Sequence, residues 1–483
     1  EKVGNTDYVL ADTNMVQPIR YKGYQYYPDE KVFKAKAITN AVFMYPDSLF
    51  RRRRRDQTLS RLMSLGTFKF VEIRFRPSAD GDTAVITPGP DGAAGRLGVR
   101  QRLDADVLMT QVKKKSLRAE VQLATKTNGF TGPALTVGFR NRSALRGAEQ
   151  LIVNATAAFE TQTRASGNAV GLTSYELGLN AQLLIPRLIA PAFLNPRLPN
   201  SDFQPRTSIG AGYKSIARTN FFRQDLFSLN YGYVFKTRIT NEQEIRPIDI
   251  QYVRLGDTTG NTAFSKLLKE KQYLRNAFQQ QFILGSSYRY TYNQQVLEQR
   301  RQQIYFSGAA EISGNVANAL SSAAGRPRDA EGRYTLAGQA FSQYAKFDLE
   351  FREYYRLSAD PSKGNRLVGR LLLGAGLPYG NSNGTGMPYI KQYGIGGPNS
   401  VRAFAARQIG PGTYRPTTAA TDLTSFYDQV GDMRLEGNIE YRQDLFPYVK
   451  GALFMDAGNV WLVNEDDQRP GGKFSTSTFL NQL

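Results

Sequence analysis

The sequence predicts an all-β transmembrane antiparallel barrel preceded by a small α+β unit. Two observations lead to this fold class. From Ser116 onward, about thirteen runs alternate apolar and polar residues, which is the period of a β-strand. No stretch approaches the ~18 consecutive apolar residues that a spanning helix requires. A strand with an apolar outer face and a polar inner face is typical of a barrel in lipid with a polar lumen.

The alternating runs are long and rich in tyrosine. Five clear examples begin at Leu151, Tyr175, Phe227, Phe282 and Phe347. A soluble β-sandwich also alternates, but the number of runs, their length and their Tyr-rich ends favour the membrane barrel.

The connections between runs support the same fold. Phe446 to Gly451 is a short turn, whereas the segments at 255–277 and 378–433 are long. Short turns on one side and long loops on the other are expected of an outer-membrane-type barrel.

Residues up to about 114 predict a separate α+β unit. Two stretches with helical spacing of apolar residues precede Gly66, which is a helix-ending signal. FKFVEIRF then alternates, with Val71, Ile73 and Phe75 on one face. A Gly/Pro-rich loop at 78–100 leads into a further strand. This order of elements is typical of a small α+β domain.

Composition excludes several classes of function. The 483 residues contain no cysteine and no histidine, which excludes disulfides, Cys/His zinc sites and Ser-His or Cys-His catalysis. No phosphate-binding G-x-x-x-x-G-K-[ST] motif occurs. We therefore expect no enzymatic activity, no catalytic residues, no metal site and no cofactor.

Formal net charge is +20, which favours an anionic partner such as membrane lipid or lipopolysaccharide. The sharpest basic cluster is Arg51 to Arg55. Five consecutive residues cannot share one helical face, so we interpret this run as a solvated, fraying segment. No nucleic-acid-binding motif accompanies it, and nucleic acid is not an expected partner.

The most informative stretch runs from Tyr393 to Trp461. A long Gly-rich segment precedes two alternating runs whose inner faces carry Glu440 on the first and Phe454 and Asp456 on the second. Arg402, in the preceding loop, is the natural partner for such carboxylates. We therefore hypothesise a pairing of this arginine with the two strands.

At this point the motifs resemble a known family. TLSRLMSLGTFKFVEIRF and LRAEVQLATKTNGF, the loop sequence SVRAF with QIGPGTY, and the strand sequences NIEYR and FMDAGNVW together resemble the BamA/TamA superfamily of outer-membrane assembly barrels. Members carry periplasmic POTRA domains ahead of the barrel. The segments TLSRLMSLG and NRSALRGAE look most similar to the TamA-like proteins of Bacteroidetes-type bacteria.

The resemblance implies a domain organisation. Residues 1–16 are expected to be the tail of a preceding POTRA domain, 17–114 a POTRA domain that includes the loop at 78–100, and 115–483 the barrel. The family barrel has 16 strands, so the last ~3 are expected to be absent from this sequence.

The resemblance also implies a lumen site. The family's V-R-G-F/Y loop motif corresponds to Val401, Arg402, Ala403 and Phe404, with alanine at the usual glycine position. Arg402 is expected to contact Asp456 and Phe454, with Glu440 nearby. A guanidinium in a lumen needs carboxylate partners and an aromatic face on which to stack.

Two further sets of residues take expected roles. Gly396, Gly397 and Pro398 are expected to give the loop its tight return. Val71, Ile73 and Phe75 are expected to form a strand edge that binds clients by β-augmentation.

The implied function is assembly, insertion or translocation of outer-membrane or surface-exported clients. The implied location is the bacterial outer membrane, with the POTRA domain in the periplasm. Expected partners are outer-membrane lipid or lipopolysaccharide, nascent outer-membrane proteins, and a periplasmic TamB-like protein or accessory subunits. Two alternatives remain open. One is a two-partner-secretion-like transporter for a single substrate, and the other is a passive porin in which Arg402 is only a lumen charge.

Overall fold

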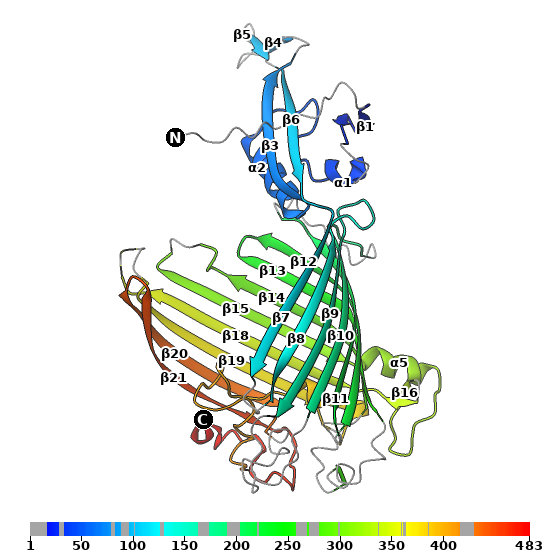
Figure 1. Cartoon of the computed structure of the whole chain (residues 1–483), viewed down its shortest axis with the longest axis vertical. Coiled ribbons are helices and arrows are strands. Elements are labelled where there is room, and N and C mark those ends of the chain that lie inside the picture. The colour runs from blue at the N-terminus through cyan, green and yellow to red at the C-terminus, as the bar shows by residue number, and fades with distance from the viewer. Residues whose placement is uncertain are drawn as a thin grey trace.

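The structure is a computed structural model, shown in Figure 1. It describes residues 17–28, 33–78, 83–87, 96–100, 102–125, 130–162, 173–190, 203–219, 222–256, 268–269, 280–297, 300–336, 338–358, 360, 364–384, 386–415 and 429–483. The expected POTRA tail at 1–16 lies outside these residues.

One large antiparallel sheet dominates the molecule (Figure 1). Its 13 described strands follow one another in chain order from β7 at one edge to β21 at the other. This confirms the prediction of a large antiparallel all-β unit. The strands are β7 (Lys115–Thr125), β8 (Phe130–Asn141), β9 (Gln150–Gln162), β10 (Thr173–Ile185), β11 (Arg206–Arg218), β12 (Phe222–Arg238), β13 (Asn241–Leu255), β14 (Gln281–Asn293), β15 (Gln302–Ser313), β18 (Tyr344–Arg356), β19 (Arg366–Pro378), β20 (Met433–Phe446) and β21 (Val449–Trp461).

The two faces of the sheet differ in chemistry. On β10, Leu177 and Leu179 are 60% and 52% exposed, and they lie on the same face as Tyr175. The opposite face of that strand carries Glu176, whose carboxylate pairs with Lys214 of β11. Apolar side chains exposed in rows on one face are stable only where lipid covers them. We call the apolar side the outer face and the polar side the inner face.

The connections lie at two ends of the sheet. Two-residue turns join β12 to β13 and β20 to β21 at the end near the N-terminal unit. Longer connections at the other end contain α5 (Asn315–Ala323), β16 (Thr335–Leu336), β17 (Gln339–Ala340) and the 3-10 turns η3 (Gly380–Ser382) and η4 (Tyr389–Lys391). A further 3-10 turn, η5 (Phe479–Gln482), follows β21. No helix among the described residues is both long and apolar enough to cross a membrane.

The N-terminal unit is a small α+β module above one end of the sheet (Figure 1). Its buried core centres on Leu62, which is 0% exposed, and includes Phe33, Ile38 and Phe68. The elements are β1 (Ile19–Tyr21), β2 (Tyr24–Tyr26), α1 (Ala35–Thr39), α2 (Arg52–Ser64), β3 (Phe68–Pro77), β4 (Thr83–Thr87), β5 (Arg96–Arg100) and β6 (Leu103–Gln111).

Two details of this unit correct the sequence interpretation. The segment 78–100 is not only a loop, because β4 and β5 pair within it as an antiparallel hairpin. The arginine run is exposed at its start, as expected, but it is helical. Arg51 is the N-cap residue of α2, and the arginines that follow it form the first turn. Tertiary contacts of this turn, including Arg54 stacked over Tyr45, oppose fraying of the run.

The N-terminal unit contacts the end of the sheet through α2. The Leu65 carbonyl accepts a 2.7 Å hydrogen bond from Gln150 Nε2, and the Ser64 carbonyl accepts one of 3.0 Å from Arg206. Arg61 donates to Gln204 in the connection before β11. Side chains of the sheet and its connections therefore satisfy polar groups at the end of this helix.

The division of the sheet into two faces predicts unequal effects of a charge. Leu177→Arg places a cation on the outer face and should destabilise the folded protein in lipid by about 2–4 kcal/mol. Asn180→Arg, three residues on and on the inner face, is the matched control and should cost little. Urea unfolding in phospholipid vesicles, followed by gel mobility, measures both. Equal losses would contradict the assignment of the faces.

Candidate functional site

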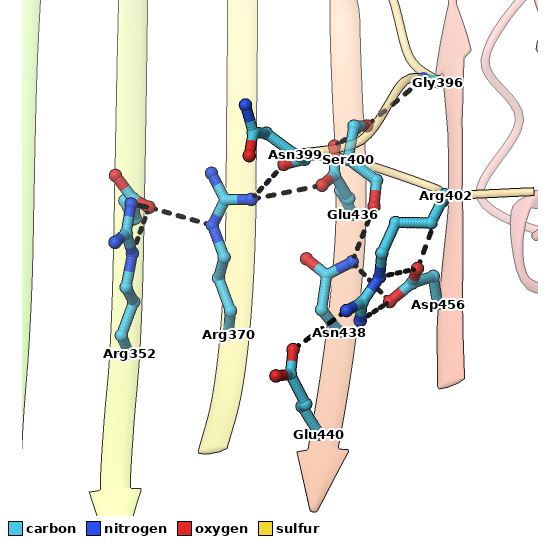
Figure 2. A network of polar contacts seen from close by, with 11 residues as sticks. Arg352, Arg370, Gly396, Asn399, Ser400, Arg402, Glu436, Asn438, Glu440 and Asp456 are labelled. Atoms are coloured by element: carbon cyan, nitrogen blue, oxygen red, sulfur yellow. Dashed lines mark hydrogen bonds and ion pairs between the residues drawn. The ribbon is translucent and has the colours of Figure 1, made fainter. Parts of the chain in front are cut away.

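The long segment between β19 and β20 turns back along the inner face. Tyr393 bridges to Gly431, and Ile395 bridges to Ile409, so the two arms of the segment are held together. Val401 packs with Ile395 and Val460 in a buried cluster. We call residues 393–409 the return loop. Its position brings Arg402 against β20 and β21 (Figure 2).

Arg402 is bound at four points. Its Nε and Nη2 donate to the two carboxylate oxygens of Asp456, each at 2.8 Å, in a bidentate pair. Its backbone N–H donates to Asp456 Oδ2 at 3.1 Å, and Nη1 donates to Glu440 Oε2 at 2.9 Å. The guanidinium carbon lies 3.5 Å from the ring centroid of Phe454. The structure thus places together the four side chains that the sequence pairs.

The contacts of Arg402 with Asp456 are important for stability because both side chains are largely shielded from water. The side chain of Asp456 is 4% exposed and that of Arg402 is 24% exposed. A carboxylate at this depth needs a cation and hydrogen bonds to offset its lost hydration. The hydrogen bond with Asp456 raises the pKa of Arg402 further above its usual range. The guanidinium therefore keeps its charge, as arginine does in proteins.

The strand register explains why the partners meet. Asn438 of β20 lies opposite Asp456 of β21, and Glu440 lies opposite Phe454. All four side chains consequently share the inner face at neighbouring positions. Asn438 Nδ2 donates to Asp456 Oδ1 at 3.0 Å and to the Ser400 carbonyl at 3.2 Å, so it joins the return loop to the wall.

A second group of polar contacts holds the start of the return loop. Ser400 Oγ donates to Glu436 Oε2 at 2.7 Å, and Arg370 Nη1 donates to the Asn399 carbonyl at 2.8 Å. Glu436 is 1% exposed. Arg370 also donates to Glu350 at 2.9 Å, which in turn pairs with Arg352. Figure 2 shows this chain of charges across β18, β19 and β20.

The turn before Arg402 requires glycine at one position. Gly396 and Gly397 have φ of +109° and +96°, a region that favours glycine. A Cβ on Gly396 would lie 2.1 Å from the Ala405 carbonyl oxygen. Pro398 follows directly and is exposed. These residues form the tight return that the sequence predicts.

The segment that forms this arrangement matches a known protein family. The Omp85 superfamily domain matches residues 200–479, which is more than half of the chain and includes the return loop and both partner strands.

The chain belongs to the Omp85 superfamily.

Three solved structures are similar to this chain. BamA from Haemophilus ducreyi lacking POTRA domains 1–3 matches with a TM-score of 0.50 and 12% identity, over 89% of this chain and 70% of that chain. CdiB from Acinetobacter baumannii matches with a TM-score of 0.43 and 11% identity, over 91% of this chain and 63% of that chain. CdiB from Escherichia coli matches with a TM-score of 0.43 and 10% identity, over 91% of this chain and 65% of that chain. The match to BamA and the large antiparallel sheet show that the chain has a BamA-like β-barrel fold.

The remaining residues of the Omp85 loop motif lie at the tip of the return loop. Ala403 and Phe404 are exposed. Ala403 is not among the described residues with positive φ, so the methyl group at the position usually held by glycine causes no backbone strain. This departure from the motif leaves the contacts of Arg402 in place.

The predicted client-binding edge lies far from this site, on β3. Val71, Ile73 and Phe75 are half-buried, and β3 pairs on one side with β6. No described strand pairs with its other side. Phe75 also stacks edge-on against Phe50 at 5.0 Å. That this edge binds clients stays a prediction.

Sequence reasoning missed four residues that hold the return loop: Arg370, Ser400, Glu436 and Asn438. The alternation placed Glu436 and Asn438 on the inner face but gave no partner for them. The described residues hold no group of acidic, histidine or cysteine side chains arranged to bind a metal ion.

A double-mutant cycle measures the pair. Arg402→Ala leaves Asp456 buried without its cation and should lower the free energy of unfolding by about 3 kcal/mol. Asp456→Asn should cost less, and the double variant should show a coupling energy of about 1–3 kcal/mol. Urea unfolding in vesicles measures all three.

The matched control is Arg366→Ala, an exposed arginine at the start of β19. It should change stability by no more than about 0.5 kcal/mol. Additive effects of the two site substitutions would show that the pair contributes nothing as a pair.

The turn gives a second test. Gly396→Ala and Gly397→Ala both place alanine at positive φ, but only the first meets a backbone oxygen, since the closest atom to a Cβ on Gly397 is 3.7 Å away. Gly396→Ala should therefore displace the return loop and increase its cleavage by protease. Gly397→Ala should show only the smaller conformational cost of about 1 kcal/mol. Equal cleavage of both variants would refute the steric argument.

Proposed function

We propose that this chain assembles client proteins at the bacterial outer membrane, by inserting β-barrel clients or by translocating surface-exported ones. Membership of the Omp85 superfamily supports a role in outer-membrane insertion or transport. The observation that carries the proposal is the return loop fixed to the inner wall by Arg402, Asp456 and Glu440. The Omp85 match covers this loop and both strands that bind it, which favours insertion or translocation over a passive pore.

The fixed loop gives the barrel a rigid inner scaffold along β20 and β21. A bidentate pair sets both the position and the orientation of the guanidinium. The loop therefore holds β20 and β21 in one register. In this proposal, residues 393–409 keep this part of the barrel wall in shape while a client contacts the protein.

The N-terminal unit is proposed to be a POTRA domain that spans residues 17–114 and lies in the periplasm. Its order of elements and its attachment to the first strand of the sheet support this assignment. The unpaired side of β3 offers backbone N–H and C=O groups at which an extended client segment could add a strand. Nascent outer-membrane proteins are the proposed clients.

Partners and subfamily follow from the same proposal. The motifs TLSRLMSLG and NRSALRGAE favour a TamA-like protein, for which a periplasmic TamB-like partner or accessory subunits are expected. The net charge of +20 favours contact with anionic lipid or lipopolysaccharide.

Depletion of the protein in its native host, followed by quantitative proteomics of the outer membrane, tests the function. Loss of many unrelated β-barrels supports a general assembly factor, and loss of a narrow subset supports a specialised TamA-like role. Loss of one exported protein alone would replace the proposal with a dedicated transporter. An unchanged outer membrane would refute it.

Complementation separates the site from the fold. Wild type and the Arg366→Ala control should restore the depleted proteins, whereas Arg402→Ala should restore them incompletely at equal abundance in the membrane. Full restoration by Arg402→Ala would show that the fixed loop does not serve assembly.

A further inference from the structure

An apolar cavity of about 420 Å³ opens on the outer face of the sheet. Tyr233 of β12, Ile245 of β13, Tyr288 of β14 and Ala310 of β15 form a continuous row through the strand register. They share the outer face with Leu229 and Phe227, which are 47% and 42% exposed. The cavity therefore faces the hydrocarbon of the membrane.

A local irregularity makes room for the cavity. The β13–β14 register shifts between Arg246 and Asp249, and Ser286 Oγ donates to the Pro247 carbonyl inside the shift. A proline there cannot donate to the neighbouring strand, and an extra residue bends the sheet. The outer surface is consequently recessed at this point.

The connection after β10 forms a wall of the cavity. The hydroxyls of Tyr231 and Tyr233 both donate to the Ile189 carbonyl. Tyr233 and Phe235 are each only 5% exposed, although they lie on the outer face. Residues 186–190 thus lie across the lipid side of β12, at the end of the sheet next to the N-terminal unit.

A second cavity, of about 510 Å³, lies between the N-terminal unit and this end of the sheet. Leu188 lines both cavities, so they adjoin. The second one is lined by four cationic side chains, Lys34, Lys36, Arg61 and Arg187, and by one carboxylate, Glu149. Arg61 is held by Gln204, and Glu149 accepts the Gly147 N–H.

Three of the cations have no acidic partner among the residues that the structure describes. Lys34, Lys36 and Arg187 are exposed, and none of the ion pairs among the described residues includes them. Basic side chains next to a lipid-covered surface attract anionic head groups. The cationic cavity and the apolar recess share a wall. Together they suit one amphipathic molecule, with its anionic group among the cations and its apolar part in the recess.

We propose that the adjoining cavities bind one anionic phospholipid of the leaflet on the side of the N-terminal unit. The head group lies among Lys34, Lys36 and Arg187, and an acyl chain lies against Tyr233, Ile245 and Ala310. That this is the periplasmic leaflet rests on the proposed function, which places the N-terminal unit in the periplasm. The site itself rests only on the two cavities and on the lipid-facing side of the sheet.

The test uses the full chain reconstituted in vesicles of phosphatidylethanolamine with a minor share of phosphatidylglycerol, then extracted gently for native mass spectrometry. Wild type should retain phosphatidylglycerol about tenfold above its share in the vesicle. Lys34→Glu combined with Arg187→Glu should abolish this enrichment, because it reverses the charge at the head group. Ala310→Phe should remove the bound lipid of either class, because it fills the apolar recess.

Matched controls lie elsewhere on the same surfaces. Lys450→Glu changes an exposed lysine at the start of β21, and Ala157→Phe enlarges an exposed outer-face alanine of β9. Both should retain wild-type enrichment. Ala190→Phe, in the wall of the recess, replaces Ala310→Phe if that variant does not give the folded gel mobility.

Three results would refute the proposed lipid site. They are the absence of excess phosphatidylglycerol on wild type, a loss of it from the control variants as large as from the site variants, and its displacement by added lipid A. The outcome is independent of client assembly. If phosphatidylglycerol is enriched but depletion of the protein leaves the outer membrane unchanged, the lipid site stands and the proposed function fails. If depletion alters the outer membrane but no lipid is enriched, the proposed function stands and the lipid site fails.

Discussion

The ion pair between Arg402 and Asp456 is the interaction on which the inner wall depends. The carboxylate of Asp456 is nearly buried, so leaving it without a cation should cost about 3 kcal/mol. The loop must therefore reach β21, and the tight turn at Gly396 gives it a path to do so. Glu440 accepts a hydrogen bond from Nη1, the guanidinium nitrogen outside the bidentate pair, and Asn438 donates a further one to Asp456 Oδ1.

The sequence predicts the residues around Arg402 much better than the contacts that hold the start of the return loop. Strand alternation has a period of two, so the inner positions of Glu440, Phe454 and Asp456 could be assigned without knowing the register. The contacts of Arg370 with Asn399 and Glu436 depend on the pairing of β19 with β20 and on the backbone of the loop. No local pattern encodes these. For the same reason the local sequence did not predict the β4–β5 hairpin within the Gly/Pro-rich segment, nor the helix that begins in the arginine run.

The two ends of the sheet are specialised for different environments. At the far end, long segments fold back and neutralise inner-wall charges with other protein charges. At the end near the N-terminal unit, Lys34, Lys36 and Arg187 have no acidic partner within the described part of the chain, and they lie beside a recess that faces lipid. The basic side chains of the chain therefore fall into two groups. Some pair with acidic side chains inside the barrel, and others are exposed where the membrane supplies the anions.

The end of α2 has a consequence for motion of the N-terminal unit. The carbonyl oxygens of Ser64 and Leu65 are bound by Arg206 and Gln150, which belong to the sheet. Docking thus supplies two hydrogen bonds to the C-terminal end of α2, and on undocking water would have to replace them. The stability of this turn and the docking of the unit are therefore linked, and the linkage acts in both directions. A force that swings the unit away from the sheet should weaken the last turn of α2, and a ligand that stabilises the docked turn should hold the unit in place.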